Sequence, residues 1–278
     1  MRSTRIGDLN RGSARNGGRN GGGRKAAVVL GILGGLAAVV AVALVVLSST
    51  GAFVIKGVVT KGVSHLTDQE MAQLAAVPEG STLLTIDTEA VRRNLLRDAW
   101  IKDASVIRLF PDKLELAVTE RTIQAVVEVQ SSATSKSQQW AIASDGRWLM
   151  PIPDQDSEAG KATSAQVYED AAKVMHIQNI LVSAEPQIGE PCGEESVNNA
   201  LSIISGMSTE LADQVKTIVA SDADSTTLVL ENGVEIAFGT ADDIRNKERV
   251  CLELMKQYEG SIAYINVRSV DRPTWRSA

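Results

Sequence analysis

Two short runs of alternating apolar and polar residues lie within Trp100–Arg121 and predict a β-hairpin. The runs are separated by Pro111 and Asp112, which are typical turn residues. An earlier run, Phe53–Gly62, is rich in β-branched residues and predicts another strand. The hairpin and the earlier strand together supply three strands of one small sheet.

Apolar positions at helical spacing predict two helices between the first strand and the hairpin. Thr67 and Glu70 form a capping-box pattern before the first helix, and either Asp87 or Thr88 can cap the second. The order strand, helix, helix, strand, strand predicts an α+β unit in which both helices cover one face of a three-stranded sheet.

The rest of the chain has many short apolar runs and predicts a larger, mixed β domain. Its expected elements are a hairpin over Trp140–Pro153 turning at Asp145-Gly146, a strand over Gln178–Ser183, a helix within residues 193–211, strands over Val215–Gly239 with a turn at Asn232-Gly233, a helix over residues 241–258 and one final strand over Ser261–Trp275. Residues 154–178 are acidic and rich in alanine, and we interpret them as an insertion with some helix.

A different pattern occupies Ala26–Leu47, which is 22 residues long and contains no charged side chain. At about 1.5 Å per residue, such a helix would match the hydrocarbon core of a bilayer. A cleaved signal peptide is the alternative, but its apolar region would be shorter. We therefore expect a retained single-pass membrane helix. Arg24 and Lys25 precede it, which favours a cytoplasmic N-terminus and exported C-terminal domains.

Charge divides the chain in the same way. The net charge is -6, yet residues 1–25 carry six Arg and Lys25 against Asp8 alone, so the expected exported part is strongly acidic. The tail is rich in Gly, Arg, Asn and Ser and is expected to be disordered. Its Arg residues suit anionic lipid headgroups better than nucleic acid, because no aromatic residues are interleaved with them.

The sequence offers no recognisable catalytic, cofactor or metal motif. It contains no P-loop, no G-x-S-x-G elbow and no paired C-x-x-C or H-x-x-x-H pattern. The two histidines, His65 and His176, are isolated in the sequence, and we interpret them as solvated or core residues. The pattern indicates a protein that recognises partners rather than an enzyme.

The two cysteines, Cys192 and Cys251, both follow the apolar run. Export would permit a disulfide, and their spacing does not decide whether one forms. Cys251 lies on the inner face of the expected helix 241–258, which favours a buried thiol.

The order of these motifs resembles the FtsQ/DivIB family of bacterial cell-division proteins. The matching stretches are "FVIKGVVTKGVSHLTDQEM", "VPEGSTLLTIDTEAVRRNLL", "WIKDASVIRLFPDKLELAVTER", "WAIASDGRWL", "GVEIAFG" with Lys247, and "AYINVR". Three positions depart from the family pattern: Trp100 and Ile123 stand where proline is usual, and Asn266 stands where aspartate is usual.

The resemblance implies a domain organisation. It consists of a basic cytoplasmic tail (residues 1–25), a transmembrane helix (26–47), a POTRA domain (53–121) and a β domain (122–278). It also implies location at the division septum, with no cofactor.

The resemblance further implies a non-enzymatic divisome scaffold that binds FtsB and FtsL and helps to couple them to septal wall synthesis. In the family the last strand of the β domain pairs with FtsB. Carried onto this chain, that role gives the candidate partner-binding residues Tyr264, Arg268, Ser269, Val270, Asp271 and Trp275. An unpaired strand edge can accept a partner strand, and Pro273 should interrupt the pairing. The alternative is that Arg268 and Trp275 only contact their own domain.

Two other functions remain open. A membrane-anchored wall enzyme would need a nucleophile or metal site that the motifs do not supply. A membrane-anchored POTRA-type chaperone or sensor outside cell division would share the architecture but not the septal location.

Overall fold

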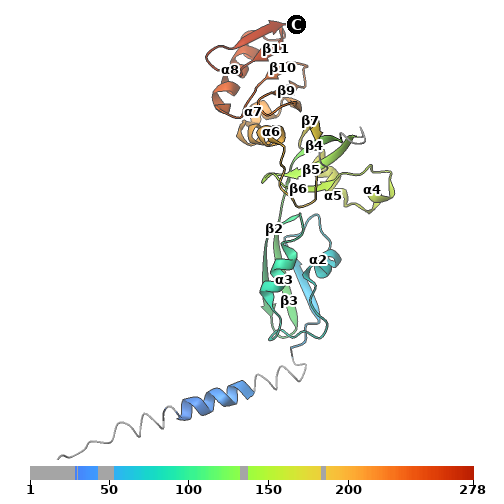
Figure 1. Cartoon of the computed structure of the whole chain (residues 1–278), viewed down its shortest axis with the longest axis vertical. Coiled ribbons are helices and arrows are strands. Elements are labelled where there is room, and N and C mark those ends of the chain that lie inside the picture. Colours follow the sequence, from blue (N-terminus) through green and yellow to red (C-terminus); the bar gives the residue numbers. More distant parts are fainter. Residues whose placement is uncertain (1–28, 30, 43–52, 132–136, 183–185) are drawn as a thin grey trace, which may run out of the picture. The chain divides into compact units, whose positions relative to one another are not determined.

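The computed structural model describes residues 29, 31–42, 53–131, 137–182 and 186–278 (Figure 1). The predicted basic tail lies outside them. The predicted span Ala26–Leu47 is described only at Val29 and residues 31–42, which are helical. Among the described residues, no helix has both the length and the apolar character needed to cross a membrane.

The N-terminal sheet has three strands, β1 (Gly57–Lys61), β2 (Ile101–Leu109) and β3 (Lys113–Glu120), in the order β1-β3-β2. The predicted hairpin is confirmed, since β2 and β3 pair antiparallel on either side of Phe110–Asp112. β1 runs parallel to β3 and is shorter than the predicted strand, because Val54 pairs only with Thr82 in an isolated bridge.

Helices α2 (Asp68–Ala75) and α3 (Thr88–Leu95) pack on this sheet, and both predicted caps are present. Thr67 and Glu70 form the reciprocal capping box of α2, and Asp87 accepts hydrogen bonds from two backbone N–H groups at the start of α3. Alternation along β3 puts Leu114 and Leu116 on its buried face, where they form a core with the fully buried residues of the helices.

The C-terminal sheet contains nine strands in the order β12-β11-β10-β9-β8-β7-β4-β5-β6. These strands are β4 (Ile123–Ser131), β5 (Ser137–Ala143), β6 (Trp148–Pro151), β7 (Met175–Val182), β8 (Val215–Ala220), β9 (Thr226–Leu230), β10 (Glu235–Ala237), β11 (Ile262–Asn266) and β12 (Thr274–Ser277). The helices are α4 (Glu158–Ala162), α5 (Ala165–Ala171), α6 (Glu195–Gly206), α7 (Thr209–Ala212) and α8 (Ile244–Gln257).

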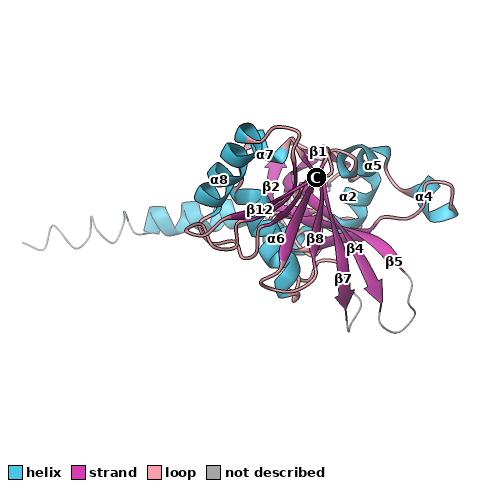
Figure 2. Ribbon diagram, turned by 90° about the horizontal axis from the view of Figure 1, so that it is seen from above, coloured by secondary structure: helices cyan, strands magenta, loops and turns pink. Residues whose placement is uncertain are grey.

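The two faces of this sheet bury different helices. Ala125 and Val127 of β4 pack in the large core that includes α6 and Cys251 of α8, whereas Val126 between them packs with Val167 of α5. Because side chains alternate along a strand, α6 and α5 therefore cover opposite faces. Figure 2 shows β4, β5, β7 and β8 side by side, with the helices lying outside the sheet.

The structure corrects the predicted final strand. Ser261–Trp275 is not one strand, because the chain turns over residues 268–273 and returns as β12, antiparallel to β11. A hydrogen bond from Arg272 N–H to the Ser269 carbonyl closes this turn. Pro273 then precedes β12, where the lack of a backbone N–H removes no hydrogen bond between the strands.

Candidate partner-binding edge

Strand β12 forms one end of the C-terminal sheet, with β11 as its only neighbour among the described strands. All four of its residues are exposed. A strand with one neighbour leaves the N–H and C=O groups on its outer side available to another chain. This edge is therefore the candidate site, and it lies at the end of the sheet farthest from β6 in the strand order.

The backbone of β12 is held in place on its inner side. Ile265 lies opposite Trp275 and Asn266 opposite Thr274, and Ala278 N–H donates to the Ser261 carbonyl beyond the end of the strand. Since successive N–H groups of a strand alternate in direction, the Ser277 N–H is directed outward. The outer side is available without breaking the β11–β12 pairing.

Aromatic side chains line both faces of the edge. Trp275 shares a face with the buried Ile265 and packs against Tyr258 at the end of α8, with ring centroids 4.4 Å apart and the rings tilted by 35°. It nevertheless stays 37% exposed. On the other face, the Arg276 guanidinium lies 4.2 Å from the centroid of the Tyr264 ring. These contacts fix the aromatic side chains while leaving part of their surface open.

The six sequence-predicted residues fall into three places. Trp275 lies on β12 itself, Tyr264 lies on the neighbouring strand β11, and the other four lie in the connecting turn. The four turn residues are Arg268, Ser269, Val270 and Asp271. The structure thus brings Tyr264 and Trp275 to the same edge, on opposite faces.

Arg268 is engaged within its own domain, although its side chain is exposed. Its guanidinium donates to the Ser225 hydroxyl at 3.0 Å, and its backbone N–H donates to Asn266 Oδ1 at 3.1 Å. Its Cγ also lies close to Gly239, where an added Cβ would come within 3.0 Å of it. Gly239 also has a φ of +78°, which favours glycine. Both the backbone conformation and the lack of space for a Cβ therefore favour glycine at this position.

A buried lysine braces the loop beside Arg268. Lys247 of α8 is 1% exposed, and its ammonium donates to the Thr240 carbonyl at 2.9 Å and to Asp242 Oδ1 at 2.7 Å. The Thr240 hydroxyl also donates a hydrogen bond to Asp242 Oδ1. The bond from Lys247, and after it the bond from the Thr240 hydroxyl, holds the pKa of the Asp242 carboxyl below its usual value. Asn199 of α6 donates a hydrogen bond to the Gly239 carbonyl and accepts one from the Ala241 N–H.

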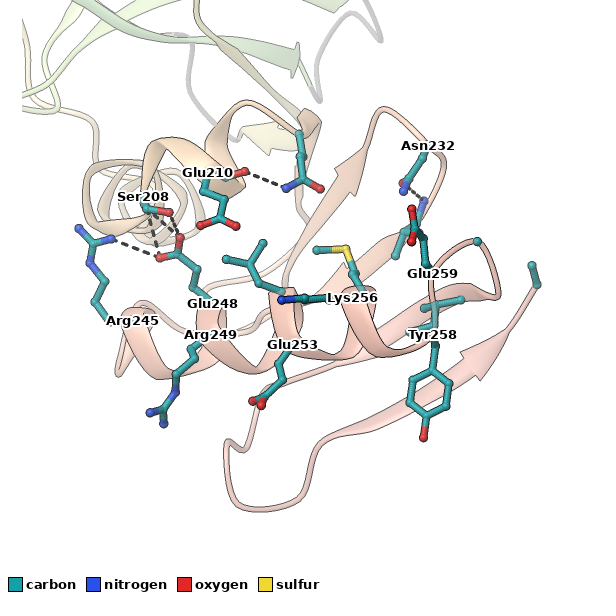
Figure 3. Close-up of a pocket in the computed structure, with 17 residues that line it drawn as sticks. Ser208, Glu210, Asn232, Arg245, Glu248, Arg249, Glu253, Lys256, Tyr258 and Glu259 are labelled. Atoms are coloured by element: carbon teal, nitrogen blue, oxygen red, sulfur yellow. Dashed lines mark hydrogen bonds and ion pairs between the residues drawn. The ribbon is translucent and has the colours of Figure 1, made fainter.

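Next to the end of β12 lies an open groove of about 1050 Å³ along α8 (Figure 3). Its lining includes Ala278, the residue that follows β12. The buried Glu248 carboxylate faces it, but accepts hydrogen bonds from the Ser208 N–H and hydroxyl and from Arg245 at 3.4 Å. Glu248 is therefore a structural tie between α7 and α8.

The thiols are buried and free in this structure. Burial raises the pKa of Cys192 to about 11 and that of Cys251 to about 12. Both groups are therefore protonated and weakly nucleophilic at neutral pH. No cluster of three or more metal-ligating side chains occurs in the part of the chain that the structure describes.

Comparison with known proteins decides the family. A model of the POTRA domain, FtsQ-type, matches residues 53–121, and a model of the cell division protein FtsQ/DivIB C-terminal domain matches residues 135–268. The chain belongs to the FtsQ/DivIB family of cell division proteins.

Individual relatives agree with this family. The chain is 27% identical to the cell division protein FtsQ of Streptomyces collinus over 72% of the chain and 69% of that protein. It is 27% identical to FtsQ of Mycolicibacterium smegmatis over 86% of the chain and 62% of that protein. It is 33% identical to FtsQ of Bradyrhizobium diazoefficiens over 38% of the chain, but this match spans only 29% of that relative.

Among solved structures, POTRA1-2 of the periplasmic domain of Omp85 from Anabaena is similar over 30% of the chain and 56% of that structure. Its sequence identity is 12% and its TM-score is 0.23, which is too low to carry an argument.

Within this FtsQ/DivIB chain, the six residues named from the sequence did not include Thr274, Arg276 and Ser277, which form the edge strand with Trp275. The signal was Pro273, because a proline that cannot donate to a ladder commonly stands just before a strand. Reasoning from apolar spacing also missed Lys247 and Glu248 as buried residues of α8. That spacing selects only apolar side chains and has no means to find buried charged side chains.

Proposed function

We propose that this protein is a non-enzymatic scaffold of the division machinery, which binds FtsB-like and FtsL-like proteins and helps to couple them to septal cell-wall synthesis. The observation that carries the proposal is the exposed edge of β12 in a chain of the FtsQ/DivIB family. Main-chain hydrogen bonds would supply affinity for an added strand, and side-chain contacts would supply specificity.

The side chains around the edge suit such a partner. Trp275 offers an apolar anchor that its contact with Tyr258 already orients. Binding therefore costs little conformational entropy at this side chain. Arg276 on β12 and Arg268 in the turn before β12 place positive charge near this edge, which favours a partner segment that carries carboxylates. Ser269, Val270 and Asp271 extend the contact surface along the turn.

The same proposal includes the topology expected from the sequence. Residues 26–47 would anchor the protein in the cell membrane with residues 1–25 in the cytoplasm, and residues 53–121 and 122–278 would form the extracytoplasmic POTRA and β domains. The protein would collect at the division septum through its partners.

A single proline tests the edge directly. The substitution Ser277→Pro removes the outward N–H but leaves Ala278 N–H and the inner ladder intact, so we expect co-purification of FtsB-like and FtsL-like proteins to fall at least tenfold, the equivalent of about 1.4 kcal/mol. Ser277→Ala is the matched control, because it removes the hydroxyl and keeps the N–H.

The control should bind like the unchanged protein, and both variants should keep the same circular dichroism spectrum. Unchanged co-purification by the folded Ser277→Pro variant would refute pairing at this edge.

A further inference from the structure

The junction between the POTRA domain and the β domain contains a histidine, His65, that is not part of the candidate partner-binding edge. His65 lies in the loop between β1 and α2, and its side chain is 6% exposed. Its ring stacks on Trp100 with centroids 4.1 Å apart and an interplanar angle of 17°. A titratable ring is thus buried against an aromatic side chain at the start of the POTRA hairpin.

Both ring nitrogens of His65 meet a carboxylate. Nδ1 lies 2.7 Å from Glu120 Oε2 in β3, and Nε2 lies 3.1 Å from Asp170 Oδ2 in α5. A neutral imidazole carries one N–H, whereas the imidazolium carries two, and a carboxylate only accepts. Both contacts are therefore hydrogen bonds only when His65 is protonated.

The two carboxylates belong to different domains and are each held in place. Glu120 is the last residue of β3, and its side chain is 6% exposed. Its carboxylate accepts hydrogen bonds from the backbone N–H groups of His65 and Leu66. Asp170 belongs to the β domain, and its other oxygen accepts from Gln166 at 3.0 Å and from Lys173 at 3.3 Å. The imidazolium thus bridges two preoriented acceptors across the junction.

Other charged groups lie near this junction. The charged groups around it are Glu120 from β3, Asp170 from α5, Lys173 after α5, Glu70 from α2, Asp98 after α3 and Arg121 after β3. Burial raises the pKa of Asp98, against the hydrogen bond from the Trp100 N–H, and Glu70 and Glu120 raise it further. Four carboxylates thus face two permanent cations, and Arg121 is already paired with Asp145 at 2.8 Å.

The segment that carries Asp170 is the insertion whose role the sequence left open. Ser157 caps α4, and Gly160 lies so close to the Asp154 carbonyl that a Cβ could not fit. Tyr168 of α5 donates to the Pro153 carbonyl, so the segment is tied back on itself. Val167 and Ala171 of α5 then share one buried cluster with Trp100 and with Ala141 and Leu149 of the sheet.

We propose that residues 154–173 form a latch that holds the POTRA and β domains in one orientation, and that protonation of His65 closes it. When His65 carries two N–H groups, the imidazolium joins Glu120 to Asp170 and the latch is closed. When the ring is neutral, one of the two hydrogen bonds is lost and two carboxylates remain at the junction without the cation between them. The inference concerns the orientation of the domains, and it holds whichever partner binds β12.

The distance between two spin labels tests the latch in the full chain. Labels on Glu89→Cys in α3 and Glu231→Cys after β9 report on both domains, and the native Cys192 and Cys251 are too buried to react. We expect one narrow distance distribution at about pH 5 and loss of that narrow distribution at about pH 8.5, because histidine is the side chain type that usually changes charge between such values.

His65→Gln should lose the narrow distribution at both pH values. His176→Gln is the matched control, because it removes the other histidine, and it should behave like the unchanged chain. Asp170→Asn gives a second test at a more exposed position, with Asp156→Asn as its control in the same segment, in case His65→Gln does not fold. Of the two Asn variants, we expect Asp170→Asn to lose the narrow distribution at about pH 5 and Asp156→Asn to keep it. A distribution that is the same at both pH values in the unchanged chain, or a folded Asp170→Asn variant that keeps its pH response, would overturn the latch.

Discussion

At the scale of single residues, buried charged side chains hold loops of this protein in place. Lys247 and Glu248 are adjacent in α8, are both buried, and each binds a different segment. Lys247 fixes the loop that packs against Arg268, and Glu248 fixes the start of α7. Removing one partner of a buried, hydrogen-bonded charged group lowers the stability of the fold, because the remaining polar group stays buried without a hydrogen bond.

Lys247→Met should therefore destabilise the fold by about 1–3 kcal/mol, since it keeps the volume of the side chain and strands the Thr240 carbonyl. Chemical denaturation measures this free energy of unfolding. Lys256→Met is the control, because Lys256 is exposed on the same helix, and its effect should lie within about 0.5 kcal/mol of zero. Equal stability of the two variants would contradict the bracing role.

The pH dependence of that loop follows from the lowered pKa of Asp242. A carboxyl whose folded-state pKa lies below its unfolded value contributes stability that is complete above the unfolded pKa and is lost as the pH falls through the folded one. In the unchanged protein, stability should decline below about pH 4 as Asp242 is protonated. In Asp242→Asn this part of the decline should be absent in denaturation curves measured across the acid range.

At the scale of elements, the caps were predictable from sequence, because a cap is made by residues within one turn of each other. The capping box of Thr67 and Glu70 is an example. The second helix left Asp87 and Thr88 as equal candidates, and the structure selects Asp87, whose Oδ1 accepts from both Glu89 N–H and Ala90 N–H at 3.0 Å.

Asp87→Ala should consequently cost about 1 kcal/mol of stability, and Thr88→Ala should cost much less. Both variants can be compared by thermal or chemical denaturation under the same conditions. A larger loss in Thr88→Ala would mean that the helix begins one residue later than in this structure.

The edge strand β12 was not predictable as a separate element. The periodicity of Ser261–Trp275 predicted continuation, whereas the turn at residues 268–273 depends on contacts far away in the sequence. These include the hydrogen bond from Arg268 to Ser225 and the close approach of Arg268 to Gly239. Only the packed fold shows that the chain reverses there and exposes a new edge.

At the scale of the whole molecule, the family and the order of its elements fit a protein of cell division. A fluorescent fusion of the full chain should therefore concentrate at the division septum, and the Ser277→Pro variant separates partner binding from fold. A uniform signal along the cell envelope would favour the alternative of a POTRA-type chaperone or sensor outside division.

The sequence by itself determined the features that depend on neighbouring residues: the hairpin of β2 and β3, the capping box of α2, the turns at Asp145-Gly146 and Asn232-Gly233, and the family motifs. The tertiary structure alone decided which segments far apart in the chain meet. It turned the last run into two strands, paired Lys247 with the loop at Thr240, and set His65 between Glu120 and Asp170. The physical reason is that periodicity and capping act within a few residues, whereas buried hydrogen bonds and ion pairs join residues that only packing brings together.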